Sequence, residues 1–229
     1  MFLNGSPLFT GAAESGESEI RRYLLEHDMV EAIVAMPNDF FFNTGIATYI
    51  WVITNNKSDE RKSKVQLINA NGIFSKMRKS LGSKRKQFTD EQIEQIVRLY
   101  DAFEEADPKL SKVFANDEFG YTTVTVERPL LDEEGKPITD KKGNLKSDGS
   151  LRDTENIPLG ESIDAYFKRE VLPYVPHAWM DRKKDKIGYE IPFTRYFYEY
   201  TPLRPSSEIL TEIKELEASI ANQLQKAGL

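Results

Sequence analysis

Two short runs of almost uninterrupted apolar residues constrain the fold more than any other feature of this sequence. Residues 30–36 read VEAIVAM and residues 46–54 read IATYIWVIT, and each run has the length of a strand. Strands of this kind are covered on both faces, as in the helix-flanked sheets of α/β proteins. Because two strands cannot make a stable sheet on their own, we expect the missing strands to lie upstream of residue 1.

Helix signals surround these runs. Ser18 predicts the N-cap of a first helix, with one apolar face formed by Ile20, Tyr23 and Leu24. Thr89, followed three residues later by Gln92, forms a capping box that predicts the start of a second helix. The apolar stripe of that second helix consists of Ile93, Ile96, Val97, Tyr100 and Phe103.

The remaining chain alternates between strand-like and polar segments. Residues 65–69 and 121–127 are typical of strands, whereas 131–156 is a polar excursion with turns at Gly135 and Gly143. A helix is expected over 162–171, and Ser206 predicts the cap of a C-terminal helix.

Composition excludes several kinds of chemistry. The 229 residues contain no cysteine and only two histidines, at positions 27 and 177, so disulfides, thiol catalysis and Cys or His zinc sites are excluded. We expect no bound metal and no catalytic constellation in this chain. No apolar run approaches the ~20 residues of a membrane span and no secretory leader is visible, which favours a cytoplasmic protein.

Positive charge is concentrated in one segment. The formal net charge is −6, yet residues 57–88 carry ten basic and only two acidic side chains. Within it lie six cations without a carboxylate: Lys76, Arg78, Lys79, Lys84, Arg85 and Lys86. A nucleic-acid backbone is the simplest partner for such a cluster, because binding releases condensed counterions. A solvated loop that keeps the protein soluble is an equally good interpretation.

Three consecutive aromatic residues occupy the segment between the two apolar runs. Phe40, Phe41 and Phe42 cannot all point into one core, so at least one ring is expected to be exposed or to line a cleft. Such a ring stacks well on an unpaired nucleobase, and enzymes that act on a base in duplex DNA first extrude it. On the residues alone, anchoring of the loop to neighbouring helices is the favoured alternative.

The expected C-terminal helix has a narrow apolar seam. Its members are spaced by three or four residues: Ile209, Ile213, Leu216, Ile220 and Leu224. Such a helix packs on its own domain or against a helix of a partner, and both interpretations stand.

Several blocks, in order along nearly the whole chain, resemble the modification (methyltransferase) subunit of type I restriction–modification systems. They are GSPLFTG at 5–11, GESEIRR at 16–22, EAIVAMP at 31–37, NTGI at 43–46, KMRKSLG at 76–82, DTENIPL at 153–159 and GYEIPF at 188–193. Those subunits resemble adenine-specific DNA methyltransferases that use S-adenosylmethionine.

The resemblance implies an α/β fold: the last strands of a Rossmann-like S-adenosylmethionine-dependent methyltransferase sheet, followed by an α+β tail with a C-terminal helix. Residues 1–87 would be the C-terminal part of the catalytic domain, and 88–229 a region for partner docking. The family's cofactor-binding glycine motif and Asn-Pro-Pro motif precede the matched part, and no Asn-Pro dipeptide occurs here. We therefore expect the C-terminal portion of such a subunit, inactive by itself.

The resemblance also implies roles for the candidate residues. Phe42, then Phe41, with Asn43 beside them, corresponds to the place where related enzymes set an aromatic ring against the target base. The basic segment gains DNA or a specificity subunit as its partner, and the C-terminal seam a docking role towards the specificity subunit. The restriction subunit of the complex is a further expected partner. The alternative is a non-catalytic module that binds DNA or protein as a scaffold.

Overall fold

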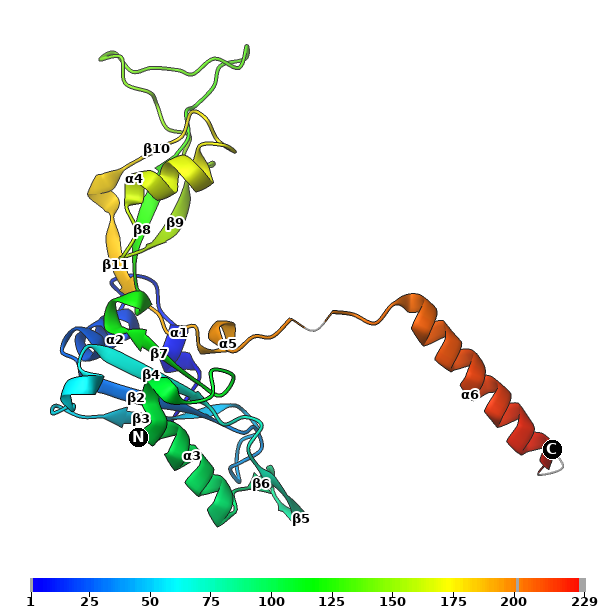
Figure 1. Ribbon diagram of the computed structural model, residues 1–229. Helices are drawn as coiled ribbons and strands as arrows, with labels where there is room; N and C mark the ends of the chain where they lie inside the picture. Colours follow the sequence, from blue (N-terminus) through cyan, green and yellow to red (C-terminus); the bar gives the residue numbers. More distant parts are fainter. Residues whose placement is uncertain (1, 201, 227–229) are drawn as a thin grey trace. The chain divides into compact units, whose positions relative to one another are not determined.

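A computed structural model describes residues 2–200 and 202–226 of the chain as a mixed α/β protein (Figure 1). The chain forms two compact units, residues 1–197 and 198–229. The second unit contains one long helix, α6 (Ser206–Lys226). Ser206 was predicted to be the N-cap of this helix, and it is instead its first helical residue. No helix in the described ranges is long and apolar enough to cross a bilayer.

The first unit is built on a five-stranded sheet in the order β1-β3-β2-β4-β7. Its strands are β1 (Phe2–Asn4), β2 (Val30–Met36), β3 (Thr48–Ile53), β4 (Lys64–Asn69) and β7 (Ser111–Ala115). β2 and β4 are parallel, and β3 is antiparallel to both β1 and β2. The expectation of missing strands upstream of residue 1 stays a prediction, and within the described residues β4 and β7 join the two apolar runs in the sheet from downstream.

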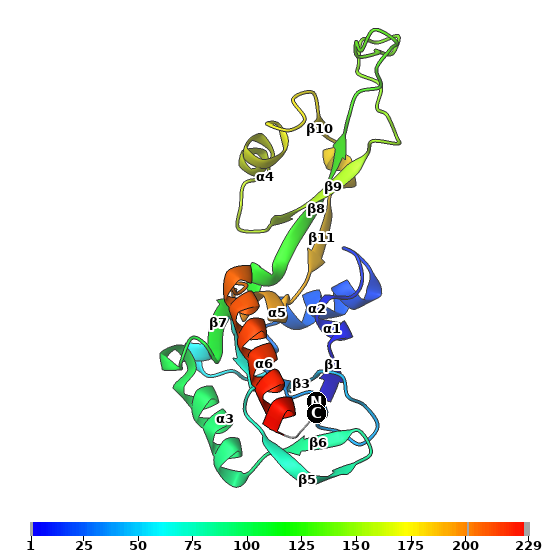
Figure 2. The ribbon, with the colours of Figure 1, turned by 90° about the vertical axis from the view of Figure 1, so that its right-hand side faces the viewer.

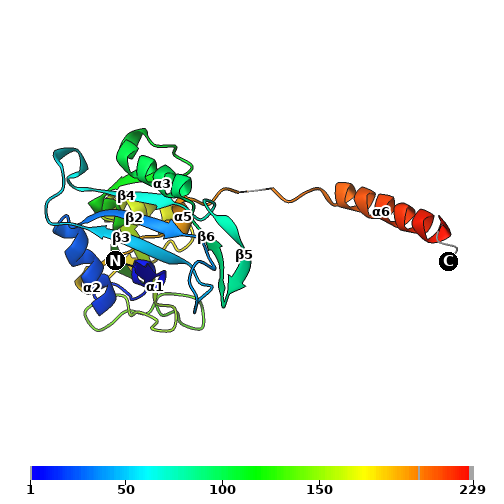
Figure 3. The same ribbon diagram turned by 90° about the horizontal axis from the view of Figure 1, so that it is seen from below.

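Helices cover both faces of this sheet (Figure 3). The helices α1 (Ser6–Phe9) and α2 (Gly16–Glu26) lie on one side, and α3 (Asp90–Ala102) lies on the other. The predicted division of roles between residues 1–87 and 88–229 stays a prediction, although α3 and β7 from the later range pack into the sheet of the earlier one.

Helix α2 differs from its sequence prediction. Ser15, not Ser18, is the N-cap, and its hydroxyl accepts a hydrogen bond from the Ser18 amide at 3.4 Å. The buried face carries Ser18, Arg21 and Leu25, whereas the predicted apolar residues Ile20 and Tyr23 are exposed. The buried face of α2 is therefore rotated about the helix axis from the face that the apolar residues predicted.

Helix α3 begins as predicted. The Thr89 hydroxyl accepts from the Gln92 amide at 3.4 Å, and the Gln92 side chain accepts from the Thr89 amide at 3.0 Å. Its buried residue is Leu99, with Ile96 and Tyr100 packed beside it. Ile93 and Val97 of the predicted stripe are exposed, because the helix contacts the sheet only along its C-terminal half.

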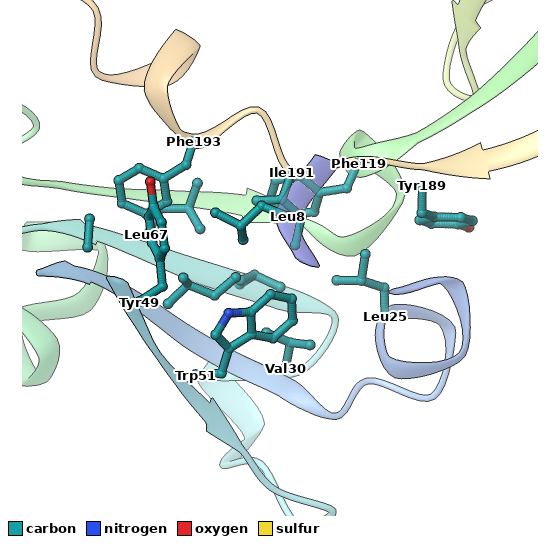
Figure 4. Packing of buried hydrophobic residues seen from close by; sticks show 13 residues of the cluster. Leu8, Leu25, Val30, Tyr49, Trp51, Leu67, Phe119, Tyr189, Ile191 and Phe193 are labelled. Carbon is teal, nitrogen blue, oxygen red and sulfur yellow. The ribbon is translucent and has the colours of Figure 1, made fainter. Parts of the chain in front are cut away.

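The main core lies on the α1 and α2 side of the sheet (Figure 4). Tyr49 and Trp51 alternate with Ile50 along β3, so the first two face this core and Ile50 faces the α3 side. Late segments of the chain close the core, and Figure 4 shows Phe119, Ile191 and Phe193 packed over the sheet residues.

A second sheet of four strands carries the rest of the first unit (Figure 2). β8 (Gly120–Glu127) pairs with β9 (Asp153–Pro158), β10 (Trp179–Met180) and β11 (Lys186–Tyr189), all antiparallel. The helix α4 (Ile163–Tyr166) continues as a π-helical turn over Phe167–Val171 and covers this sheet through a small apolar cluster.

The polar excursion between β8 and β9 is an irregular ladder of isolated bridges. Gly135 and Gly143 lie at its turns with φ of 80° and 84°, as the sequence predicted. Short helical turns complete the unit: Asp59–Arg61, Phe103–Glu105, Asn116–Phe119, Arg182–Lys184 and α5 (Phe193–Tyr196).

Candidate nucleic-acid interface

Three strands of the first sheet end at the same edge. Asn4 of β1 lies opposite Thr48, Thr48 lies opposite Met36 of β2, and Ala35 pairs with Asn69 of β4. Loops that follow these carboxyl ends therefore leave the sheet side by side. Ligands of open α/β sheets bind in the crevice outside the carboxyl ends of the strands. This edge is where the candidate residues are found.

The aromatic loop, residues 37–47, leaves this edge after β2. Phe41 forms a bridge with Thr44, so Phe42 and Asn43 are at the tip of a tight turn. Phe42 is 56% exposed and Asn43 is exposed, whereas Phe40 and Phe41 are partly covered. The prediction that the three rings do not share one core is confirmed, and the ring that projects is Phe42.

The basic segment forms a β-hairpin, not a loop. Strand β5 (Ser75–Leu81) pairs with β6 (Lys84–Gln87) around a turn at Gly82 and Ser83. Lys76 lies directly opposite Lys86 in the register. Like charges opposite each other destabilise a strand pair, so the hairpin carries a repulsion that an anion would relieve.

No carboxylate relieves this repulsion within the described part of the chain. None of the six cations of the hairpin forms an ion pair with Asp or Glu there. Many other lysines and arginines of the described chain do form such pairs. Lys76, Arg78, Lys79 and Arg85 are exposed, and Lys84 and Lys86 are partly covered. The basic hairpin therefore presents uncompensated charge to solvent.

The basic hairpin and the aromatic loop are joined through their backbones. The Ser83 amide donates to the Phe42 carbonyl at 3.0 Å. The Asp39 carbonyl accepts from the amides of Arg85 at 2.8 Å and Lys86 at 3.2 Å. Asp39 has a φ of 59°, a left-handed conformation that Asp tolerates better than most residues. The carbonyl that accepts the two hairpin amides therefore belongs to a residue in a tight turn.

Cation–π contacts add to this junction. The Lys84 ammonium lies 5.4 Å from the Phe40 ring centroid and 5.5 Å from that of Phe42. The Lys86 ammonium lies 4.1 Å from the centroid of Phe74. Phe40 also packs against Phe88, with centroids 4.6 Å apart. The alternative in which the rings anchor the loop thus holds for Phe40, whereas Phe42 remains largely exposed.

Sequence reasoning treated the loop and the basic segment as separate features and missed their contact. It also missed Gly82, whose φ of 61° permits the turn. A Gly-Ser pair between two runs of strand-forming length is a hairpin signal that could have revealed the fold of this segment. The docking of the hairpin on the loop leaves no trace in local sequence.

The third predicted site lies in the second unit. All five seam residues of α6 are 43–62% exposed, and no residue of that helix is buried. The seam is therefore available along the described helix.

The buried ionic groups elsewhere have structural roles. Burial tends to raise the pKa of Asp28, but hydrogen bonds from Lys57, Ser63 and Asn116 outweigh it and lower the pKa below its usual range. Glu127 behaves alike: burial is opposed by Arg152 and Lys184, and the net pKa is lowered. No group of three or more Asp, Glu or His side chains within the described ranges could hold a metal ion.

A cavity of about 470 Å³ is lined by Leu25, Asp28, Ser63, Asn116 and Tyr189, among others. A second of about 470 Å³, mostly apolar, lies beside α1 and α2 and includes Arg21 and Trp51. Neither cavity is lined by a candidate residue from the sequence.

Comparison with known proteins gives the following similarities. Residues 3–127 match the model of the N-6 DNA Methylase family. The chain is 34% identical over 102 residues to the type I restriction enzyme MjaIX methylase subunit of Methanocaldococcus jannaschii, covering 44% of this chain and 18% of that protein. It is 32% identical over 156 residues to the type I restriction enzyme HindI methylase subunit of Haemophilus influenzae, covering 63% and 33%.

Among solved structures, the type I restriction-modification methyltransferase subunit from Streptococcus thermophilus aligns at 27% identity and a TM-score of 0.44, covering 52% of this chain and 23% of that chain. The matched segments thus span a third or less of the length of these relatives.

Proposed function

The chain belongs to the N-6 DNA methylase family, and on that premise we propose that it forms part of a type I restriction–modification methyltransferase subunit that methylates adenine N6 in DNA. The observation that carries the proposal is the exposed Phe42 at the carboxyl edge of the sheet, held against a basic hairpin without acidic partners. A nucleic acid offers both a base and a phosphate to such a surface.

Phe42 is proposed to contact the extruded base. Its ring is 56% exposed at the tip of the aromatic loop, and aromatic stacking contributes about 1–3 kcal/mol per base without sequence readout. The exposed amide of Asn43, the next residue, offers a donor and an acceptor to the edge of the same base. Phe41 is partly covered, and its bridge with Thr44 closes the same turn.

The basic hairpin is proposed to contact the phosphate backbone. Each phosphate neutralised by a Lys or Arg releases condensed counterions, so the exposed cations favour binding most at low salt. The hairpin contacts the aromatic loop, which supports phosphate contacts close to the proposed base contact.

S-adenosylmethionine would supply the methyl group to the adenine amino nitrogen. The family's cofactor-binding glycine motif and the Asn-Pro-Pro motif that holds that nitrogen are expected upstream of the matched part, and no Asn-Pro dipeptide occurs in the 229 residues. The residues present therefore do not fit the cofactor, and no transfer step is assigned to this chain. We propose that the chain alone is inactive and contributes base and backbone contacts.

The C-terminal helix is proposed as the docking element for the specificity subunit of a complex that also contains a restriction subunit. Its 21 residues extend about 31 Å at 1.5 Å per residue, and the apolar seam is exposed along that length. An exposed seam also favours the second candidate function, a scaffold module that binds its partners without touching a base.

Replacement of Phe42 separates the two functions. In the methylase assembled with its partner subunits, Phe42→Ala is expected to lower methylation of target DNA by about five- to 150-fold, because it removes a stacking contact of about 1–3 kcal/mol. Assembly, measured by size-exclusion chromatography, should be unchanged. Unchanged turnover would reject the base contact and favour the scaffold. Cofactor-dependent methylation by the purified chain alone would reject the proposed inactivity.

A further inference from the structure

The tip of the basic hairpin touches the aromatic loop where Phe42 projects. The amide that follows Gly82 donates to the Phe42 carbonyl, and the first two amides after Lys84 share the Asp39 carbonyl. Three backbone hydrogen bonds thus fix both ends of the segment that carries the three rings. The position of Phe42 depends on the conformation of the hairpin.

Gly82 permits this approach for two reasons. Its φ of 61° is one that side chains with a Cβ rarely adopt. A Cβ at this position would also lie 2.8 Å from the Phe42 carbonyl oxygen, a distance at which something must shift. Any other residue would therefore push the hairpin tip away from the loop.

Lys84 makes a second link, through its side chain. Its ammonium lies between 5.4 and 5.5 Å from the centroids of Phe40 and Phe42, within the ~6 Å range of a cation–π contact. Phe40 is itself packed against Phe88, so the ammonium ties the exposed ring to an anchored one. The neighbouring Arg85 is exposed and makes no cation–π contact with a ring in the described part of the chain, and it serves as the matched comparison.

We propose that Gly82 and Lys84 are positioning residues that couple phosphate contact by the hairpin to base stacking by Phe42. The exposed cations bind the phosphates of the nucleic acid. The main-chain hydrogen bonds between hairpin and loop, together with the Lys84 ammonium, hold the Phe42 ring at a set distance from those phosphates. The ligand is an unpaired purine flanked by phosphodiesters. The inference rests on the proposed base contact of Phe42 and adds the residues that orient it.

The two kinds of cation should behave differently. Lys84 is partly covered by two rings, so its removal should release the ring while costing little phosphate binding. Arg85 should show the reverse, because an exposed cation on a phosphate contributes about 0.9 to the slope of log affinity against log salt on duplex DNA.

The experiment uses the 229-residue chain and a duplex with one unpaired 2-aminopurine, whose fluorescence falls when it stacks. Two quantities are measured: the quenching at saturation, and the salt dependence of the dissociation constant. Phe42→Ala is expected to lose at least half of the quenching. Lys84→Met and Gly82→Ala are expected to lose a similar share while the salt slope changes by less than about 0.5. Arg85→Met should keep the quenching and reduce the slope by about 0.9.

Circular dichroism establishes that each variant folds, and if Gly82→Ala does not, Lys84→Met decides the matter. Loss of quenching in Phe42→Ala with wild-type quenching in both Lys84→Met and the folded Gly82→Ala would overturn the coupling and leave the base contact standing. Unchanged quenching in Phe42→Ala would reject the base contact and the coupling with it. Failure of the unaltered chain to bind or quench the probe would reject both.

Discussion

The Arg21 Nε donates a hydrogen bond of 2.5 Å to the carbonyl oxygen of Tyr189, a residue 168 positions further along the chain. The same guanidinium donates to the carbonyls of Pro7 at 3.1 Å and Thr10 at 2.7 Å. Arg21 is 2% exposed, and burial lowers its pKa from the usual value. One side chain of α2 thus joins α1 and its C-cap, Thr10, to the end of β11.

Removal of this guanidinium should destabilise the protein strongly. Arg21→Met keeps the apolar stem but leaves the buried carbonyl of Tyr189 and the part-buried carbonyls of Pro7 and Thr10 without their donors, and a buried unsatisfied group costs about 1–3 kcal/mol. We expect the free energy of unfolding, measured by urea denaturation, to fall by about 3 kcal/mol or more. Arg21→Lys should recover little, because one ammonium cannot match the guanidinium geometry.

The matched control is Arg22→Met on the same helix. Arg22 forms ion pairs with Glu26 at 2.9 Å and Glu19 at 3.8 Å, and its side chain is 34% exposed. Pairs of this kind contribute about 0–1 kcal/mol. Equal losses in the two variants would contradict the assigned role of Arg21.

Helix α2 also shows where sequence reasoning stopped. The apolar pattern pointed to Ile20 and Tyr23, and the helix instead buries Ser18 and Arg21. The Ser18 hydroxyl accepts from the Tyr189 amide at 3.0 Å, so both polar residues face partners on β11. A local pattern counts serine and arginine as exposed, and only the distant carbonyls and amide make their burial favourable.

Features set by local interactions were predicted well. The run 30–36 is strand β2, and the box of Thr89 and Gln92 caps α3, because neighbouring residues determine both. The crowding of three consecutive rings also predicted that at least one is exposed, and the structure identifies that ring as Phe42. Its contact with the basic hairpin joins residues about forty positions apart through backbone bonds, and such bonds carry no side-chain signature.

Alkaline pH should destabilise the fold through two tyrosines. Burial, and next the hydrogen bond to Glu31, raises the pKa of Tyr100 to about 12. Burial, and next the hydrogen bond to Glu26, raises the pKa of Tyr189 to about 12. In the unfolded chain both titrate near 10, so the folded state holds these protons more tightly. Their contribution is complete below pH 10 and is lost as pH rises from 10 towards 12.

Each tyrosine should add up to about 1.4 kcal/mol per pH unit to the fall in unfolding free energy across that interval. Tyr100→Phe and Tyr189→Phe should each flatten the fall, as measured by urea denaturation at a series of pH values. Tyr174→Phe, whose ring is 83% exposed, is the control and should leave the profile unchanged. If Tyr100→Phe and Tyr189→Phe both keep the steepness of the wild-type profile, the pKa values of these two hydroxyls do not differ between the folded and the unfolded state.

The apolar seam of α6 should determine partner binding. Ile213 and Ile220 lie near the middle of the exposed helix, and apolar anchors at the centre of an interface contribute about 2 kcal/mol or more each. Ile213→Asp combined with Ile220→Asp is therefore expected to weaken binding to the specificity subunit by more than a hundredfold, measured by titration calorimetry. Deletion of residues 206–229 should abolish it.

The control pair, Thr211→Asp with Asn222→Asp, places the same charges on the opposite side of the helix, about 160–180° from the seam at 100° per residue. It should leave affinity within a fewfold of wild type, and circular dichroism should show equal helix content in both pairs. If the control pair weakens binding as much as the seam pair, the added negative charge and not the loss of the apolar seam weakens binding. That result would contradict the seam as the docking surface.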